Sequence, residues 1–364
     1  MKIVKKSFGV IPKELPADVC LDAYVGKEIF NYVLSNDNGM SVTVSEFGAV
    51  IIDIMTPDKD GHIDDMILGF DDLKSYIENR VCFGAPVGRN ANRISEHSFT
   101  INGVFYELPD NDSGCNLHSC IENNYYRRVW DFVETKESAS EVSVTFHLFS
   151  PDGDQGYPGN MDIYITYGLK NDGSLVITYK GRSDKDTLFN MTNHSFFNLA
   201  GESSGKCLDQ LVFIDAPTMT ENRKGNVPTG RIIDVRGTEL DFTVPKPLGQ
   251  DIFSDNEMIV NAKGYDFNYI LDNGGKLKLC ASLKHPTNGR VMEVYTDLPG
   301  IQIYSGNYLN NAGKNGHVYK DYDGVCFESH IWPDAIHHDN FPNPVLKADT
   351  DFVTQTVYKF FVEK

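Results

Sequence analysis

The stretch EVSVTFHLFS, residues 141–150, alternates apolar and polar side chains with a period of two. Such alternation places the apolar side chains on one face of an extended chain and predicts a half-buried β-strand. The stretch MDIYITYGL, residues 161–169, repeats the pattern. The apolar positions of the two stretches are Val142, Val144, Phe146 and Leu148, followed by Met161, Ile163, Ile165, Tyr167 and Leu169. Two consecutive half-buried strands favour an antiparallel sheet that covers a core.

Turn-forming sequences separate the strand-like stretches. Asparagine, aspartate and glycine tolerate the backbone angles of tight hairpin turns. They occur in NDNG at 36–39, NG at 102–103, NDGS at 171–174 and NGG at 273–275. The C-terminal stretch DFVTQTVYKFF, residues 351–361, alternates again. We therefore expect hairpins in succession, with sheet structure from the N-terminal region to the last residues.

Helical spacing is rare in the sequence. The best case is GFDDLKSYIENR, residues 69–80, in which Phe70, Leu73 and Ile77 are spaced as on one face of a short helix. No Pro/Ser-rich linker, low-complexity tract or fixed-period repeat divides the chain. We predict an all-β fold, a large antiparallel β-sandwich with few short helices, forming a single domain over residues 1–364.

The charge balance restricts the partners. The sequence has 33 basic and 51 acidic residues, a net charge of −18 at pH 7. This field repels nucleic acids, anionic lipids and phosphorylated metabolites, whereas a neutral sugar is bound through short-range hydrogen bonds and apolar contacts. No apolar run approaches the length of a membrane span, and the N-terminal region lacks the apolar core of an export signal. We expect a cytoplasmic protein with neither nucleic acid nor membrane as a partner.

Metal and disulfide signatures are weak. The seven cysteines are scattered and form no CxxC pair, which argues against a disulfide framework or a zinc knuckle. Cys115 and Cys120 flank His118, but this spacing matches no standard zinc pattern. The acidic stretch SPDGDQGYPGN, residues 150–160, departs from the calcium-loop spacing and suits tight turns. We expect no metal.

Four polar clusters interrupt the strand-like background. They are GRNANRI at 88–94, NLHSC at 116–120, TNHSFFNLAG at 192–201 and GVCFESHIWPDA at 324–335. Taken alone, His118 and His194 suit core histidines that donate to backbone carbonyls, and Arg93 suits a surface ion pair. Glu328 ends a buried strand-like run, where an unpaired carboxylate is costly, so it needs a partner or a chemical task.

In their order along nearly the whole chain, these segments resemble the aldose 1-epimerase (galactose mutarotase) family. The resembling stretches include FGAPVGRNANRI, DGDQGYPGN, TNHSFFNLAG, TDLPGIQIYSGNYL and FESHIWPDA. The resemblance implies a β-sandwich of the galactose-mutarotase type and a cofactor-free isomerase that interconverts the α and β anomers of free aldoses, such as galactose and glucose. It also implies a small-molecule sugar substrate and a cytoplasmic place in hexose metabolism. The sequence leaves open whether the protein is a monomer or a homodimer.

By motif position, the resemblance implies that His194 is the general acid and Glu328 the general base. The residues that it implies for holding the sugar are Asn92, Arg93, His118, Asp266 and Gln302. The chain departs from the family pattern at four positions. The family usually has two glycines in place of Ser119 and Cys120, a histidine in place of Phe267 and a glutamine in place of His330. These departures bear on which sugar is preferred.

The implied reaction explains the need for two ionisable groups. The C1 hydroxyl loses a proton while the ring oxygen gains one, and the open-chain aldehyde then recloses on its other face. A carboxylate and an imidazole suit these transfers because their pKa values lie near neutrality. We expect an ionised Glu328 and a protonated His194 at rest, with their opposite charges stabilising each other. Either Phe196 or Phe197 is expected to exclude water from the pair.

Other functions fit parts of the pattern. A glycoside hydrolase would need two carboxylates, for which Asp266 and Glu328 are the candidates. A non-catalytic carbohydrate-binding β-sandwich would use the same pocket without an acid-base pair. A mutarotase for hexose phosphates would require additional basic residues, which the net charge disfavours.

Overall fold

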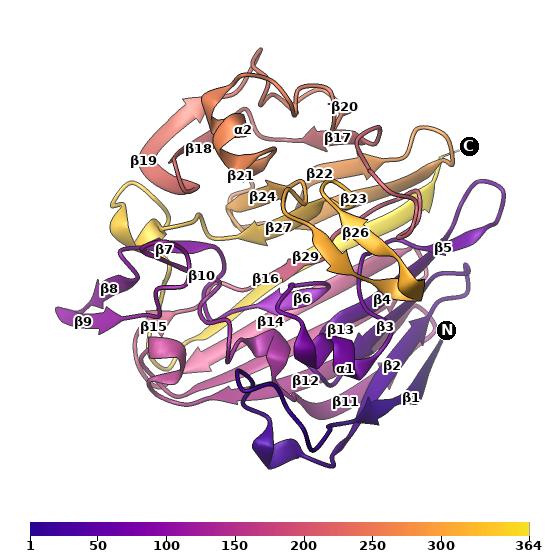
Figure 1. Ribbon diagram of the computed structural model, residues 1–364, viewed down its shortest axis with the longest axis horizontal. Coiled ribbons are helices and arrows are strands. Elements are labelled where there is room, and N and C mark those ends of the chain that lie inside the picture. The colour runs from indigo at the N-terminus through magenta and orange to yellow at the C-terminus, as the bar shows by residue number, and fades with distance from the viewer. Residues whose placement is uncertain (364) are drawn as a thin grey trace.

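The computed structural model describes residues 1–363 and is almost entirely β structure (Figure 1). Its largest part is a nine-stranded sheet in which every ladder is antiparallel. The strands, in spatial order, are β11 (Asp131–Glu137), β12 (Glu141–Ser150), β13 (Met161–Lys170), β14 (Ser174–Ser183), β29 (Asp351–Val362), β23 (Arg290–Thr296), β22 (Lys278–Lys284), β17 (Leu211–Ile214) and β20 (Lys246–Pro247). The prediction of a large antiparallel all-β fold is confirmed.

A five-stranded sheet covers one half of the large sheet. Its strands follow one another along the chain and are drawn in indigo in Figure 1: β1 (Lys2–Val10), β2 (Glu28–Ser35), β3 (Ser41–Ser45), β4 (Ile51–Pro57) and β5 (Ile63–Asp65). Leu34 and Ile54 on its inner face belong to the same buried cluster as Ile163 and Ile177 of the large sheet. The two sheets therefore form a sandwich around one apolar core.

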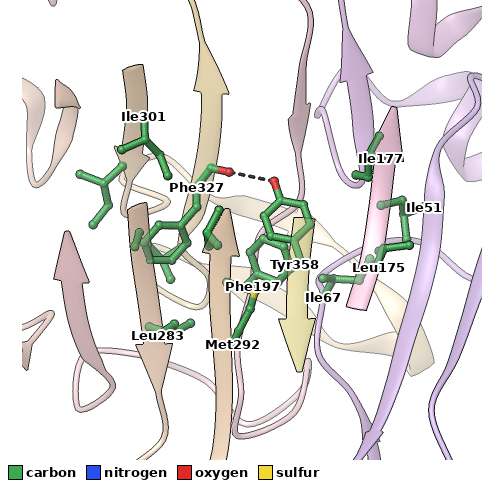
Figure 2. Packing of buried hydrophobic residues seen from close by; sticks show 14 of the residues in the cluster. Ile51, Ile67, Leu175, Ile177, Phe197, Leu283, Met292, Ile301, Phe327 and Tyr358 are labelled. Carbon is green, nitrogen blue, oxygen red and sulfur yellow. Dashed lines mark hydrogen bonds between the residues drawn. The ribbon is translucent and has the colours of Figure 1, made fainter. Parts of the chain in front are cut away.

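A second five-stranded sheet lies over the other half. Its strands, in spatial order, are β19 (Val227–Asp234), β18 (Thr218–Arg223), β21 (Asp266–Ile270), β24 (Gly300–Tyr304) and β27 (Cys326–His330). Figure 2 shows Ile301 and Phe327 of this sheet beside Leu283 and Met292 of the large sheet. The hydroxyl of Tyr358 donates to the carbonyl of Phe327 at 2.8 Å, which links the two layers directly (Figure 2).

The predicted strands correspond to real elements. In β12 and β13, every apolar position of the alternating pattern is buried, because these side chains face the sandwich core. The turns at 36–39, 102–103 and 171–174 each join two paired strands. The NGG turn at 273–275 does not close a hairpin, since it leads from β21 in one sheet to β22 in another. Local turn chemistry selects the bend but not the strand with which the next segment pairs.

Helices are short and few. The predicted helix is present as α1 (Leu73–Glu78), and Asp72 accepts the backbone N–H of Ser75 at its N-terminus. The others are α2 (Glu257–Ala262) and the 3₁₀ turns η1 (Asp22–Tyr24), η2 (Tyr125–Arg127), η3 (Asp154–Gly156), η4 (Lys314–Gly316) and η5 (Ala335–His337). Within residues 1–363, no helix has both the length and the apolar character needed to cross a membrane.

Small two-stranded ladders complete the fold. They are β6 (Ala85–Val87) with β16 (Thr192–His194), β7 (Arg93–Ser95) with β10 (Cys115–Leu117), β8 (Ser98–Ile101) with β9 (Val104–Glu107), β15 (Thr187–Leu188) with β28 (Val345–Leu346), and β25 (Asn310–Ala312) with β26 (Val318–Lys320). Two of these ladders, β6 with β16 and β7 with β10, join polar segments that are far apart in the sequence.

Candidate active site

A cavity of about 240 Å³ lies where the polar clusters meet. Six of the seven site residues expected from the sequence line it: Asn92, Arg93, His118, His194, Asp266 and Glu328. The seventh, Gln302, is buried behind the wall and reaches the cavity through Asp266, to whose Oδ1 its Nε2 donates at 2.6 Å. The fold thus gathers one polar pocket from segments spread over more than half of the chain.

His194 and Glu328 approach each other because their strands are tied together. Just beyond β16, Phe197 exchanges two backbone hydrogen bonds with Val325, which immediately precedes β27. This bridge brings His194, the last residue of β16, beside the middle of β27. The Nε2 of His194 lies 3.5 Å from Oε1 of Glu328, and both side chains are buried.

Burial shifts both groups toward their neutral forms. It lowers the pKa of His194 to about 4. It also raises the pKa of Glu328 well above its usual value, with the negative charge of Asp266 acting in the same direction and Arg93 opposing it. The resting pair therefore favours a protonated Glu328 and a neutral His194. This differs from the ionised pair expected from the sequence, because burial is the largest cause of both pKa shifts and penalises the charged forms.

His118 has a defined orientation. Its Nδ1 accepts the backbone N–H of Asn92 at 3.1 Å, and its own backbone N–H donates to the carbonyl of Asn92. Burial lowers the pKa of His118 well below its usual value, with the charge of Arg93, and that of His194 once it is protonated in acid, acting in the same direction, so the ring is neutral. With Nδ1 acting as the acceptor, the ring proton is on Nε2. His118 can then donate a hydrogen bond into the cavity.

Arg93 and Asp266 form a charged wall of the cavity. Arg93 donates from Nε to Asp112 at 2.7 Å, and its Nη1 lies 3.6 Å from Oδ2 of Asp266. Asp266 also accepts at Oδ2 from Asn226 at 2.8 Å. Both charged groups are therefore held in place by the protein before a ligand binds, as expected of residues that recognise hydroxyl groups by position.

Several residues of the site were not anticipated from the sequence. Tyr304 lies on β24 two positions after Gln302, and its ring centroid is 6.0 Å from that of His194. Tyr308 is 54% exposed at the mouth of the cavity. The period of two along β24 could have indicated Tyr304, whereas no sequence signal connects Asn226 with Asp266. Of the two phenylalanines after His194, Phe196 lines the cavity and Phe197 packs in the core beside Tyr358 (Figure 2).

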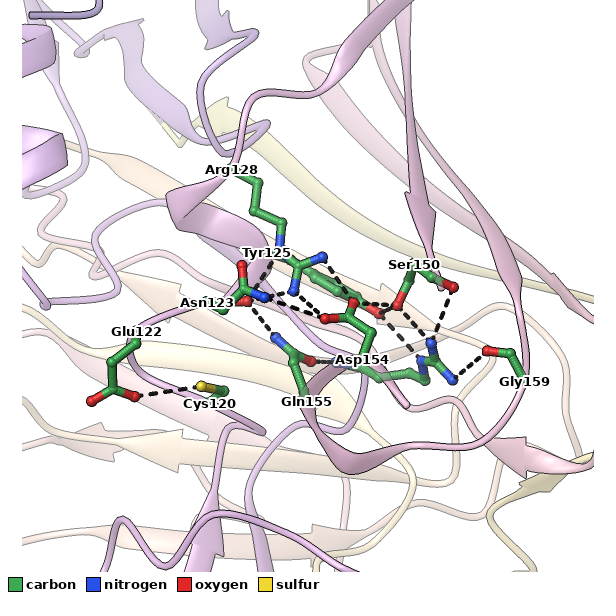
Figure 3. Close-up of polar contacts among 10 residues, drawn as sticks. Cys120, Glu122, Asn123, Tyr125, Arg128, Ser150, Asp154, Gln155 and Gly159 are labelled. Atoms are coloured by element: carbon green, nitrogen blue, oxygen red, sulfur yellow. Dashed lines mark hydrogen bonds and ion pairs between the residues drawn. The ribbon is translucent and has the colours of Figure 1, made fainter. Parts of the chain in front are cut away.

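A buried polar network supports this site from one side (Figure 3). Asp154 pairs with Arg128 at 2.7 Å, and Gln155 donates from Nε2 to the carbonyl of Asn123. The Oε1 of Gln155 accepts the backbone N–H of Arg89, whose guanidinium is fully buried and donates to Ser150. The stretch from 150 to 160 thus holds the segment that carries Asn92 and Arg93.

The four departures from the family pattern have different surroundings. The hydroxyl of Ser119 joins the network, since it accepts the backbone N–H of Asn90 and lies within hydrogen-bonding distance of the carbonyl of Asn90. Cys120 donates to Glu122 (Figure 3). Phe267 points into the core, whereas His330 is buried on the same side of β27 as Glu328. Of the four, only His330 therefore shares a strand face with Glu328.

The same cluster has the dimensions of a cation site. His118, His194 and Glu328 each offer an atom, and these atoms lie within 4.8 Å of one another. A bound ion would occupy Nε2 of His194 and the carboxylate of Glu328, which are the atoms that the acid-base roles expected from the sequence would use. Acid-base catalysis and metal binding at this cluster therefore exclude each other.

Comparisons with known proteins agree along nearly the whole chain. The family model described as aldose 1-epimerase matches residues 31–359. A galactose mutarotase from Mus musculus is 36% identical over 339 residues, covering 93% of this chain and 95% of that protein. An aldose 1-epimerase from Haemophilus influenzae is 33% identical over 331 residues, covering 90% and 94%. The crystal structure of a galactose 1-epimerase from Lactobacillus acidophilus superposes with a TM-score of 0.84 at 27% identity, covering 100% of this chain and 99% of that one.

Proposed function

Because the chain belongs to the aldose 1-epimerase family, we propose that it interconverts the α and β anomers of free aldoses such as galactose and glucose. The approach of His194 Nε2 to Glu328 Oε1, 3.5 Å apart in a polar cavity, carries the proposal. An imidazole and a carboxyl group at this separation can serve two atoms of one sugar ring. A non-catalytic carbohydrate-binding module does not require a buried imidazole and carboxyl group at this separation.

The reaction proceeds by paired proton transfers. When His194 is protonated and Glu328 ionised, Glu328 takes the proton of the C1 hydroxyl while His194 donates its Nε2 proton to the ring oxygen. The C1–ring oxygen bond breaks, and the products are the open-chain aldehyde and a neutral pair. Rotation about the C1–C2 bond presents the other face of the aldehyde. The two residues then exchange roles, and the ring closes as the opposite anomer.

The low polarity around the pair assists ring opening. Burial favours the neutral forms of both groups. Because the pair rests in these neutral forms, a proton must first pass from Glu328 to His194, and burial then favours the ring-opening step that returns both groups to neutrality. Each positioned group contributes roughly 10² to 10⁴ to the rate.

The remaining residues hold the sugar. His118 donates from Nε2, Arg93 donates from its guanidinium, and Asp266 accepts from hydroxyl groups. Gln302 and Asn226 orient Asp266 by donating to its two oxygens. Asn92 acts through its backbone, which orients His118, and through its side chain at the cavity wall.

We propose further that neither a metal ion nor an organic cofactor takes part, and that residues 1–364 fold as a single domain in the cytoplasm. The large sheet draws its strands from residues 131 to 362, and the N-terminal sheet shares its core, which supports one cooperative unit. A neutral sugar is the partner, and nucleic acid and membrane are not. The oligomeric state is a monomer or a homodimer.

Polarimetry tests the proposed reaction. Freshly dissolved α-D-glucose, α-D-galactose and a pentose should reach their usual equilibrium rotations faster with the protein than without it. Sugar binding without acceleration would favour a carbohydrate-binding module. Release of reducing sugar from a glycoside would favour a hydrolase that uses Asp266 and Glu328.

A further inference from the structure

One face of β27 contacts both nitrogens of the His194 ring. Cys326 and Glu328 are two residues apart on this strand, so their side chains point to the same side. The Sγ of Cys326 lies 3.5 Å from Nδ1 of His194, and Oε1 of Glu328 lies 3.5 Å from Nε2. Cys326 is fully buried. Within residues 1–363, no other side-chain atom makes a hydrogen bond to Nδ1 of His194.

The proposed chemistry decides which nitrogen must keep its proton. His194 has to alternate between an imidazolium and a neutral ring whose Nε2 is free to accept a proton from the sugar or Glu328. Both forms carry a proton on Nδ1. The other neutral tautomer has its proton on Nε2 and could donate it only by becoming an imidazolate. A buried Nδ1–H also needs an acceptor, since an unpaired buried donor is costly.

We propose that Cys326 is a positioning residue that accepts the Nδ1–H of His194 and thereby fixes the catalytic tautomer. The inference rests on the proposed function. A thiol sulfur is a weak acceptor, so it holds the ring without stabilising the imidazolium as a carboxylate would. A weakly held imidazolium gives up its Nε2 proton readily. Cys326 thus orients the acid and keeps it acidic.

The surroundings favour a neutral sulfur. Burial, reinforced by the negative charge of Glu328, raises the pKa of the Cys326 thiol well above its usual value. It therefore stays a thiol rather than a thiolate that would form an ion pair with His194. The other groups near the ring include Phe196, His118 and Tyr304, with centroids 5.0, 5.5 and 6.0 Å away, and the charged pair of Arg93 and Asp266 in the cavity wall. None of these side chains replaces the sulfur at Nδ1, and the backbone carbonyl of His194 contributes a hydrogen bond that favours the charged ring.

Nuclear magnetic resonance tests the tautomer without relying on activity. In protein labelled with ¹⁵N-histidine, loss of a signal in His194→Asn assigns the ring of His194. The Nδ1 shift should remain that of a protonated nitrogen throughout the active pH range, while Nε2 stays unprotonated and gains its proton only in acid, since burial lowers the pKa of His194 to about 4. A neutral ring with a bare Nδ1 would overturn the proposal. Because this measurement needs no turnover, it separates failure of this inference from failure of the proposed reaction.

Two substitutions test the consequence for catalysis. Cys326→Ala removes the only side-chain partner of Nδ1 within residues 1–363 and should lower kcat roughly tenfold while KM changes little. Cys326→Ser supplies a stronger acceptor, so it should restore much of kcat and move the titration of His194 to higher pH. Cys280→Ala removes a buried thiol that donates to Val294 in the large sheet and should leave kcat and the pH profile unchanged. Unaltered kcat and pH profiles in both Cys326 variants would also overturn the proposal. If the alanine variant does not fold, the serine variant and the spectrum of the wild-type protein still test whether Cys326 fixes the tautomer of His194.

Discussion

The backbone N–H of Asn92 donates to the ring Nδ1 of His118 at 3.1 Å. Asn92 reaches this position with a φ of 60°, in the left-handed region that asparagine and glycine tolerate better than other residues. The orientation of one proposed sugar-binding ring thus depends on an unusual backbone conformation at another site residue.

Substitution of Asn92 by alanine and by glycine separates its backbone role from its side-chain role. Both variants lose the amide side chain, but only alanine is strained at positive φ. We expect Asn92→Ala to be less stable than Asn92→Gly by about 1 kcal/mol and to have the higher KM, because His118 loses its orientation. Urea unfolding and polarimetric kinetics measure the two effects. Equal stability and equal KM in the two variants would show that the backbone conformation is unimportant.

Removal of the Asp266 carboxylate should weaken sugar binding. Asp266→Ala leaves the donors of Gln302 and Asn226 without their shared acceptor and removes an acceptor for a sugar hydroxyl. We expect KM to rise roughly tenfold or more, with a smaller change in kcat. Asp351→Ala removes an exposed carboxylate that pairs with Lys180 and serves as the control. An unchanged KM in Asp266→Ala would contradict the assignment.

The sequence predicted the strands better than it predicted their partners. The period of two found β12 and β13, because a half-buried strand carries its own signature in the chain. The NGG turn was misread as part of a hairpin, since the pairing of β21 with β24 is decided by contacts distant in sequence. Motif resemblance supplied six of the residues that line the cavity. It could not supply the contact of Asn226 with Asp266 or the contact of Cys326 with His194. Both contacts form only when segments far apart in the sequence lie side by side.

The sequence also could not predict the protonation state of the proposed catalytic pair, His194 and Glu328. The residue types suggested an ion pair, because isolated glutamate and histidine attract each other when charged. Depth of burial decides the outcome, and burial depends on packing by the whole sandwich. His194 and Glu328 are respectively 7% and 2% exposed, so desolvation opposes both charges.

Chelation should leave the enzyme active. The cluster of His118, His194 and Glu328 has the spacing of a metal site, but proton transfer requires the same atoms to be free. We expect full mutarotase activity after exhaustive dialysis against EDTA and no need for added nucleotide. Zinc added in excess should inhibit, because it would occupy Nε2 of His194. Loss of activity on chelation, restored by a metal ion, would refute this prediction.

His330 should make the protein sensitive to acid. Burial lowers the pKa of His330 to about 4, whereas an unfolded histidine has a pKa of about 6.5. Between these values the unfolded chain binds a proton that the folded chain does not, so stability falls as pH falls. His330→Gln removes this contribution, and its stability relative to wild type should rise by about 2 kcal/mol between pH 7.5 and pH 5. Urea unfolding at both pH values measures the change; a difference that does not vary with pH would contradict it.

Glu328→Gln gives the sharpest test of the catalytic pair. The substitution keeps the shape and a hydrogen-bonding group beside the C1 hydroxyl but removes the ability to accept a proton. We expect kcat to fall by roughly 10² or more while sugar affinity, measured by calorimetry, changes little. If Glu328 served only as a structural partner of His194, the same change would lower the melting temperature and leave the folded protein active.

The double variant shows whether the two residues act together. His194→Asn alone should lower kcat as Glu328→Gln does, because ring opening needs a proton donor as well as an acceptor. Once either group is lost, the remaining one cannot complete the paired transfer, so removing it as well should cost little more. Polarimetric kcat values for the two single variants and the double variant measure this coupling. Fully additive losses would mean that His194 and Glu328 contribute independently, and the mechanism of paired proton transfer would then be wrong.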